Sequence, residues 1–281
     1  MSIKSYFLGS GLVLTTFLSV YFAVGSGAQT AVQTLPAHTF DYQIGAILYQ
    51  QKAAEYRALT YQAFNIARLR LDEDLDKKNV KRLPKAERKR PRAIVVDIDE
   101  TVLDNSPANA YAAKNNLAFN IRDWYAWGEM RKAKAVPGAV NFLNYAVSKG
   151  VKIFYISNRD EVQKKATVDN LKTAGFVDIS ADNVVLRQTE STKEPRRLAV
   201  AATYRIVMLM GDNLDDFSNV FERKSILDRY AETDKARELF GKRFIVLPNA
   251  MYGTWESAVY NYERLTEQQK AERRINSLEL P

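Results

Sequence analysis

Short apolar runs alternate with amphipathic stretches from residue 93 onward. Each run is too short for a buried helix and, apart from Lys152, is apolar throughout, which predicts a strand buried on both faces. Between the runs, apolar residues recur three and four positions apart, and Gly150 and Gly175 stand where two of the stretches would end as helices. The predicted strands are Ala93–Val96, Val151–Ile156, Val184–Leu186, Ile206–Met210 and Phe244–Leu247, and the predicted helices are Pro137–Lys149, Glu161–Ala174 and Lys193–Thr203. This alternation predicts an α/β fold, with a parallel sheet flanked by helices.

Two segments interrupt the alternation and predict a smaller, mostly helical cap. From Asp41 to about Lys78, apolar positions again recur at spacings of three and four, which predicts a long helical segment. Asn105–Ala135 is rich in aromatic residues and predicts an insertion over the top of the sheet. We expect Trp127 in the core of this insertion, whereas Trp124 fits either that core or a ligand site. The prediction is therefore a single domain over residues 41–281, with a core at about 91–104 and 136–250 and a cap from about 41–90, 105–135 and the C-terminal segment.

The N-terminus predicts a targeting segment in front of this domain. Phe7–Val24 is apolar, Lys4 precedes it, and the small residues Ser26–Ala28 follow it. The pattern predicts a secretory signal peptide over residues 1–28 and a flexible leader over residues 29–40, and so a periplasmic or secreted protein. The alternative is an uncleaved membrane anchor, because the apolar run is close to the shortest that spans a bilayer. We expect contact with a membrane only in that case.

Composition excludes several kinds of chemistry. The chain has no cysteine and a single histidine, His38, close to the predicted cleavage site. Disulfides, a cysteine nucleophile, a Ser-His-Asp triad and a His/Cys zinc site are therefore excluded. The net charge is +8, and Lys77–Arg92 is densely basic, with Glu87 as its only acid. We favour a solvated connector over a binding patch for this basic run, because no aromatic residues lie among the charges, and we expect no nucleic-acid polymer as a partner.

Polar side chains follow the predicted strands at the edge where parallel sheets bind ligands. They are Asp97 and Asp99 after the first strand, Ser157 and Asn158 after the second, Lys193 near the helix that follows the third, and Asp212 to Asp216 after the fourth. If the chain stays extended, Asp97 and Asp99 point the same way, and Asp212 arrives at the same edge. Three converging carboxylates need a cation between them, and oxygen ligands suit Mg²⁺.

These residues are typical of phosphoryl transfer. We expect Asp97 to attack a phosphate monoester and form an aspartyl phosphate, and Asp99 to protonate the leaving oxygen and then activate water. Ser157, with Asn158 beside it, and Lys193 would hold the phosphoryl oxygens. Asp216 would either hold a metal-bound water or orient Lys193. Hydrolysis is the expected outcome, and the same intermediate passed to an alcohol gives a phosphotransferase as an alternative.

Two motifs carry a resemblance to a known family. "IVVDIDETVLDN" at Ile94–Asn105 and "MLMGDNLDDF" at Met208–Phe217 are similar to the paired signatures of class C bacterial acid phosphatases, of the haloacid dehalogenase superfamily. The resemblance covers the chain from Asp41 to at least Gly253. It implies a Rossmann-like core and a secreted or envelope-bound, Mg²⁺-dependent phosphomonoesterase. It also assigns four aspartates to the catalytic and metal site: Asp97 as nucleophile, Asp99 as acid/base and as a metal ligand through its main-chain carbonyl, Asp212 as a metal ligand, and Asp216 as a further acid of the metal site.

The resemblance also implies a substrate class. Members of this family act on small phosphomonoesters, often 5′-nucleotides, nicotinamide mononucleotide or aryl phosphates, and aromatic residues sandwich the leaving group. Trp124 and Tyr252 are the candidates for that role here. Well-known relatives are lipoproteins tethered through an N-terminal cysteine, which this chain lacks. A homodimer is possible for this chain. The alternative that is not an enzyme is a basic envelope-binding protein built on the phosphatase scaffold.

Overall fold

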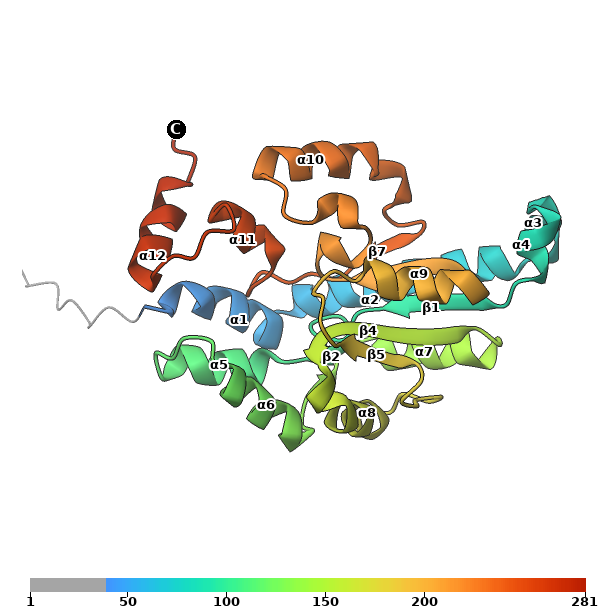
Figure 1. The fold of residues 1–281 in the computed structure, drawn as a ribbon, viewed down its shortest axis with the longest axis horizontal. Coiled ribbons are helices and arrows are strands. Elements are labelled where there is room, and N and C mark those ends of the chain that lie inside the picture. Colours follow the sequence, from blue (N-terminus) through green and yellow to red (C-terminus); the bar gives the residue numbers. More distant parts are fainter. Residues whose placement is uncertain (1–38) are drawn as a thin grey trace, which may run out of the picture. The chain divides into compact units, whose positions relative to one another are not determined.

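The computed structural model describes residues 39–281, and a five-stranded parallel sheet lies at their centre (Figure 1). The strand order is β5-β4-β1-β6-β7, and every neighbouring pair is parallel. The strands are β1 (Arg92–Val96), β4 (Lys152–Asp160), β5 (Val184–Arg187), β6 (Arg205–Gly211) and β7 (Phe244–Val246). The predicted α/β fold is confirmed. The predicted signal peptide and nearly all of the predicted leader lie outside the described residues.

The central strand β1 shows why its sequence is apolar throughout. Ile94 and Val96 point into one hydrophobic cluster, and Ala93 and Val95 point into another on the opposite face. This alternation follows from the two-residue period of a strand, and burial on both faces leaves no position for a polar side chain. Figure 1 shows α7 (Ala139–Ser148) and α8 (Lys164–Thr173) on one side of the sheet and α9 (Glu194–Thr203) on the other.

The N-terminal helical segment is divided rather than continuous. It consists of a 3₁₀ turn at Asp41–Gln43, α1 (Ile44–Lys52) and α2 (Ala54–Leu75), with Ala53 in extended backbone between the two helices. Phe64, Ala67 and Leu71 of α2 pack into the same cluster as α7, so α2 contributes to the layer that covers the sheet. The division of the domain into core and cap stays a prediction.

The basic run forms a short helical connection into β1. It contains α3 (Lys77–Arg82) and α4 (Lys85–Lys89), whose lysine and arginine side chains are exposed. Arg92, at the start of β1, donates to Asp74 Oδ2 at 2.6 Å, and this ion pair ties the end of α2 to the sheet.

The aromatic insertion is a pair of helices closed by a small antiparallel sheet. α5 (Ser106–Lys114) and α6 (Ile121–Met130) lie between β2 (Leu103–Asp104) and β3 (Lys134–Ala135), which pair with each other. Trp127 is half-buried and packs against the main hydrophobic cluster instead of a separate core of the insertion, and its Nε1 donates to Asn105 Oδ1 at 2.8 Å.

The C-terminal part adds α10 (Ile226–Lys235), α11 (Thr254–Val259) and α12 (Glu267–Asn276). Short 3₁₀ turns complete the structure at Glu161–Gln163, Leu214–Asp216, Asn219–Phe221 and Arg237–Leu239. The guanidinium of Arg274 in α12 lies 3.6 Å from the centre of the Tyr42 ring, so the two ends of the described chain meet. No helix among residues 39–281 has the length and hydrophobicity of a membrane span.

Candidate active site

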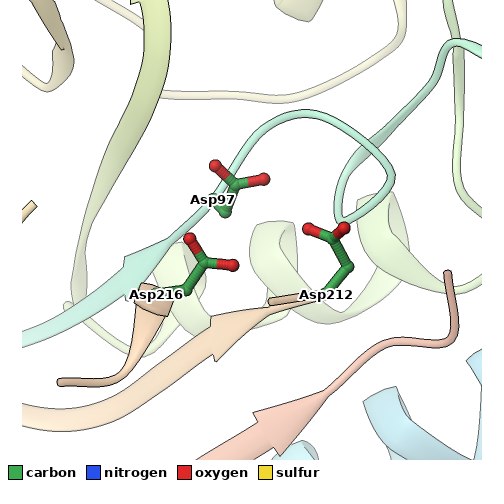
Figure 2. Close-up of side chains that lie close together, drawn as sticks. All are labelled: Asp97, Asp212 and Asp216. Atoms are coloured by element: carbon green, nitrogen blue, oxygen red, sulfur yellow. The ribbon is translucent and has the colours of Figure 1, made fainter. Parts of the chain in front are cut away.

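Three carboxylates meet at the carboxyl ends of β1 and β6. Asp97 follows β1, and its N–H still donates to Met210 O of β6 at 2.9 Å. Asp212 follows β6, and Asp216 lies one turn further along. One oxygen of each carboxylate lies within 4.8 Å of the others (Figure 2). The sheet itself therefore brings Asp97 and Asp212 together, because neighbouring parallel strands end at the same edge.

The backbone after β6 is shaped to admit Asp216. Asn213 N–H donates to Asp216 Oδ2 at 3.0 Å, which fixes the carboxylate against the start of a 3₁₀ turn. A Cβ atom on Gly211 would lie 2.3 Å from an oxygen of Asp216, closer than any real contact. Glycine at this position is therefore required for Asp216 to reach the cluster.

Lys193 supplies a positive charge between two of the acids. Its Nζ donates to Asp97 Oδ1 and, at 2.6 Å, to Asp216 Oδ1. The residue is only 7% exposed, so these charges interact with little screening by water. Burial alone lowers the pKa of Lys193, but the two carboxylates outweigh it and raise that pKa above its usual value.

Lys193 offsets only part of the negative charge of the three carboxylates, and burial together with this excess raises the pKa values of two of them. Burial raises the pKa of Asp97 to about 7; Lys193 opposes this shift, and the Asp216 and Asp99 carboxylates add to it. Burial, followed by repulsion from Asp216 and Asp97, raises the pKa of Asp212 well above its usual value. A second cation at this place would relieve both effects. Three clustered carboxylates are suitable ligands for a hard divalent metal ion, so the residues fit such a group.

Asp212 is held by three side chains that sequence reasoning missed or left unassigned. Its Oδ2 accepts from Asn249 and Asn213, both at 2.8 Å, and its Oδ1 accepts from Thr101 at 3.2 Å. Asn249 follows β7, so the rule that found the other strand-end residues would have found it too. Thr101 has no comparable signal in the sequence.

The side chain of Asp99 lies outside this cluster. Its carboxylate accepts from Arg159 Nη2 at 2.7 Å, from Asn105 Nδ2 at 2.8 Å and from Ser157 Oγ at 3.2 Å. The expectation that Asp97, Asp99 and Asp212 converge is therefore wrong for the Asp99 side chain, and Asp216 is the third member instead. The reason is local, because β1 ends at Val96 and the chain then turns, so the two-residue period of a strand no longer applies.

Arg159 is the main partner of Asp99 and was not among the predicted site residues. Its guanidinium side chain is 1% exposed and contacts both oxygens of Asp99, with Nε at 3.0 and 3.2 Å. Because a buried guanidinium needs a counter-ion, Asp99 and Arg159 stabilise each other. Arg159 lies in β4, which continues to Asp160 rather than ending at Ile156 as predicted.

The predicted phosphate-binding residues have different surroundings. Ser157 is buried in β4, and its hydroxyl lies beside Asp99. Asn158 is exposed and its Oδ1 accepts from Arg196 Nη2 at 2.6 Å, whereas Arg196 Nη1 donates to Ser157 O at 2.7 Å. Lys193 and Ser157 thus lie next to the carboxylates, and Asn158 is engaged by Arg196.

The two aromatic candidates lie near Asp99 and its neighbours. Trp124 of α6 is half-buried, and the Arg159 guanidinium lies 5.4 Å from the centre of its ring. Tyr252 is half-buried in the loop before α11, and its hydroxyl donates to Glu100 Oε2. Burial, with Asp99 and Asp212 nearby, raises the pKa of Glu100 well above its usual value. Glu100 had no assigned role, although it is the third acid of the motif.

Comparisons with known proteins agree on one family. The model of the haloacid dehalogenase superfamily, subfamily IIIB (acid phosphatase), matches residues 9–255. A class C acid phosphatase from Bacillus anthracis has a similar structure, with a TM-score of 0.80 and 38% identity over 87% of this chain and 99% of that one. A second structure of the Bacillus anthracis enzyme, with tungstate bound, matches with the same TM-score and coverage at 39% identity.

A plant relative is similar over a shorter stretch. Acid phosphatase 1 from Solanum lycopersicum is 28% identical over 128 residues, which are 43% of this chain and 50% of that one. The match therefore spans half the length of this relative. The family model and the bacterial structures, in contrast, cover most of the chain. The chain belongs to the acid phosphatases of subfamily IIIB of the haloacid dehalogenase superfamily.

Proposed function

We propose that this protein is a magnesium-dependent acid phosphatase that hydrolyses small phosphate monoesters through an aspartyl phosphate at Asp97. The observation that carries the proposal is the group of Asp97, Asp212 and Asp216, two of them buried, with Lys193 between Asp97 and Asp216. A phosphate dianion needs positive charge around it, because it otherwise repels the carboxylate that has to attack it. Tungstate, a tetrahedral oxyanion, is bound in a similar structure and supports an anion site of this kind.

Asp97, Asp212 and Asp216 would hold the metal ion, together with the main-chain carbonyl of Asp99 that the family resemblance implies. All of these donors are oxygen atoms, which favours Mg²⁺ over softer metals. When bound, the ion supplies positive charge that offsets the repulsion between the phosphate and the carboxylates.

The side chains then divide the reaction between them. An oxygen of Asp97 forms a bond to phosphorus while the bond from phosphorus to the leaving oxygen breaks. Asp99 gives that oxygen a proton and later takes one from the water that hydrolyses the aspartyl phosphate. Lys193 and Ser157 hold the phosphoryl oxygens by charge and hydrogen bond.

The leaving group would lie among aromatic side chains. We infer that Trp124 and Tyr252 contact the base or aryl ring of the substrate, which supports 5′-nucleotides and aryl phosphates as the substrate class. Both residues are half-buried; Trp124 lies beside Arg159, a partner of Asp99, and Tyr252 donates to Glu100, the residue after Asp99. A periplasmic or secreted location, after removal of residues 1–28, belongs to this proposal, and N-terminal sequencing of the mature protein tests it.

The test is release of inorganic phosphate from adenosine 5′-monophosphate and from a simple sugar phosphate. Wild-type protein is assayed with EDTA and again after Mg²⁺ is added back. The variants Asp97→Asn and Asp215→Asn are assayed in parallel. Asp215 is the matched control because it is a neighbouring acid that pairs with Arg229, at 3.2 Å, instead of joining the cluster. We expect metal-dependent release in wild type and Asp215→Asn, and none in Asp97→Asn.

Other outcomes would favour the alternatives. Transfer of phosphate to an added alcohol in preference to water would assign the protein as a phosphotransferase. No metal-dependent release from either substrate would contradict the proposal. Salt-sensitive binding of polyanions through the basic run Lys77–Arg92 would then favour the envelope-binding alternative.

A further inference from the structure

Glu100 occupies a costly position in the molecule. It is fully buried, with 0% exposure, and its φ is 60°, in the left-handed region that residues other than glycine rarely adopt. Its N–H donates to Leu103 O at 2.8 Å, which closes the tight turn after Asp99. A buried carboxylate in strained backbone costs stability twice, and such positions are typical of functional sites.

The carboxylate of Glu100 joins two parts of the chain that are far apart in sequence. Its Oε1 accepts from the Asn105 N–H at 2.7 Å, and its Oε2 accepts from the Tyr252 hydroxyl. The Asn105 Nδ2 lies 3.4 Å from the same Oε2. Glu100 therefore connects the C-terminal loop that carries Tyr252 to the start of the aromatic insertion.

Asn105 continues the connection to Asp99. It is also fully buried, and its Nδ2 donates to Asp99 Oδ1 at 2.8 Å. Its Oδ1 accepts from Trp127 Nε1 at 2.8 Å and from Arg159 Nη2 at 3.3 Å, so the amide cannot rotate without loss of hydrogen bonds. The result is a continuous series of side chains from the Tyr252 ring, through Glu100 and Asn105, to the Asp99 carboxylate.

We propose that Glu100 is a positioning residue that couples contact between the leaving group and Tyr252 to the alignment of Asp99. The inference rests on the proposed function, which assigns the leaving group to Tyr252 and proton transfer to Asp99. A ring stacked on Tyr252 restrains the phenol, and the phenol then holds Glu100 and Asn105 against Asp99. A substrate with an aromatic leaving group should therefore have a higher kcat as well as a lower KM, because proton transfer depends steeply on geometry.

The test compares benzyl phosphate with propyl phosphate. Both leave as alcohols that need a proton, and only benzyl phosphate carries a ring. We expect a higher kcat for benzyl phosphate in wild type, and a loss of that advantage, by about tenfold, in both Glu100→Gln and Tyr252→Phe. The double variant should be no worse than the poorer single variant, because both changes break one series of contacts.

Tyr260→Phe is the matched control. The Tyr260 hydroxyl also donates to a glutamate, Glu256, at 2.6 Å, but this pair lies outside the series that reaches Asp99. This variant should keep the benzyl advantage at the wild-type level. The comparison separates loss of any tyrosine–glutamate hydrogen bond from loss of the one proposed here.

Several results would overturn the inference. If Glu100→Gln lowers kcat equally for both substrates, Glu100 has only a structural role. If the losses of the two single variants multiply in the double variant, Glu100 and Tyr252 act separately. If Glu100→Gln does not fold, Tyr252→Phe still decides, because an unchanged kcat advantage in that variant excludes the connection. Failure of the proposed function is distinct, since wild type itself would then release no phosphate in the presence of Mg²⁺.

Discussion

Asp97 and Asp99 are two residues apart in one motif, and the structure gives them opposite surroundings. Asp97 lies among like charges, with Asp212 and Asp216 close by and Lys193 as its only cationic partner among the described residues. Asp99 has a buried arginine on both of its oxygens, with an amide and a hydroxyl beside it. One carboxylate is thus poorly compensated, and the other is fully compensated.

The contrast teaches how one short motif can supply two kinds of carboxylate. Enzymes that use two acids in different roles place them in different environments. Here the separation arises just after β1, which ends at Val96. Asp97 lies with the acids that follow β6, and Asp99 pairs with Arg159 of β4.

The largest effect that separates the two acids is expected in catalysis. Asp97→Asn removes the proposed nucleophile and should lower kcat by at least about 10⁴-fold for every phosphate monoester. Asp99→Asn should lower it by about 10²- to 10⁴-fold, with the smaller loss for 4-nitrophenyl phosphate, whose leaving group needs no proton. Steady-state kinetics with nitrophenyl and alkyl phosphates measure both. Equal losses for the two substrates in Asp99→Asn would contradict its role as the acid.

The second contrast is expected in stability. Asp99→Asn leaves the buried Arg159 without its counter-ion and should lower the free energy of unfolding by about 3–5 kcal/mol. Asp97→Asn should cost little in the metal-free protein, because it removes repulsion and Lys193 keeps Asp216 as a partner. Urea denaturation in EDTA measures both variants. Recovery of stability when Arg159→Met is added to Asp99→Asn would support the ion pair as the cause, and equal losses in the two single variants would refute the contrast.

The smallest effect is expected in the pH dependence of stability without metal. The pKa of Asp97 is raised from 3.8 to about 7 in the folded protein, so between these values the folded state binds more protons than the unfolded state. Its contribution to stability is complete below about pH 4 and is lost as the pH rises through about 7. Urea denaturation in EDTA across this range should show that decline in wild type and a weaker one in Asp97→Asn. Identical profiles would mean that Asp97 does not carry the shift.

Much of the fold could be predicted from the sequence because burial leaves a local record. The five strands of the sheet were all predicted, and their apolar runs reflect burial on both faces, as Ile94 and Val95 show on opposite sides of β1. The positions of Asp97 and Asp212 at one edge also follow from local information, since each directly follows a strand. The aromatic insertion was predicted because its composition differs from that of its neighbours.

Other features could not be predicted because they depend on contacts between distant segments. Nothing in the local pattern marks Ala53 as the break between α1 and α2, and β4 continues to Asp160 through polar residues that the apolar run does not include. Arg159 is not marked by its own neighbours, and only its contact with Asp99, sixty residues earlier in the chain, gives it a role.

The order of residues along the chain is enough to predict which strands form and which acids follow them, because alternation, burial and strand termination are properties of neighbouring residues. The grouping of those acids depends on tertiary contacts. The tertiary structure placed Asp216 in the cluster with Asp97 and Asp212, and it gave Asp99 to Arg159. The physical reason is that the energy of a buried carboxylate depends on the charges and donors within a few ångströms of it, and these come from strands and loops far away in the chain.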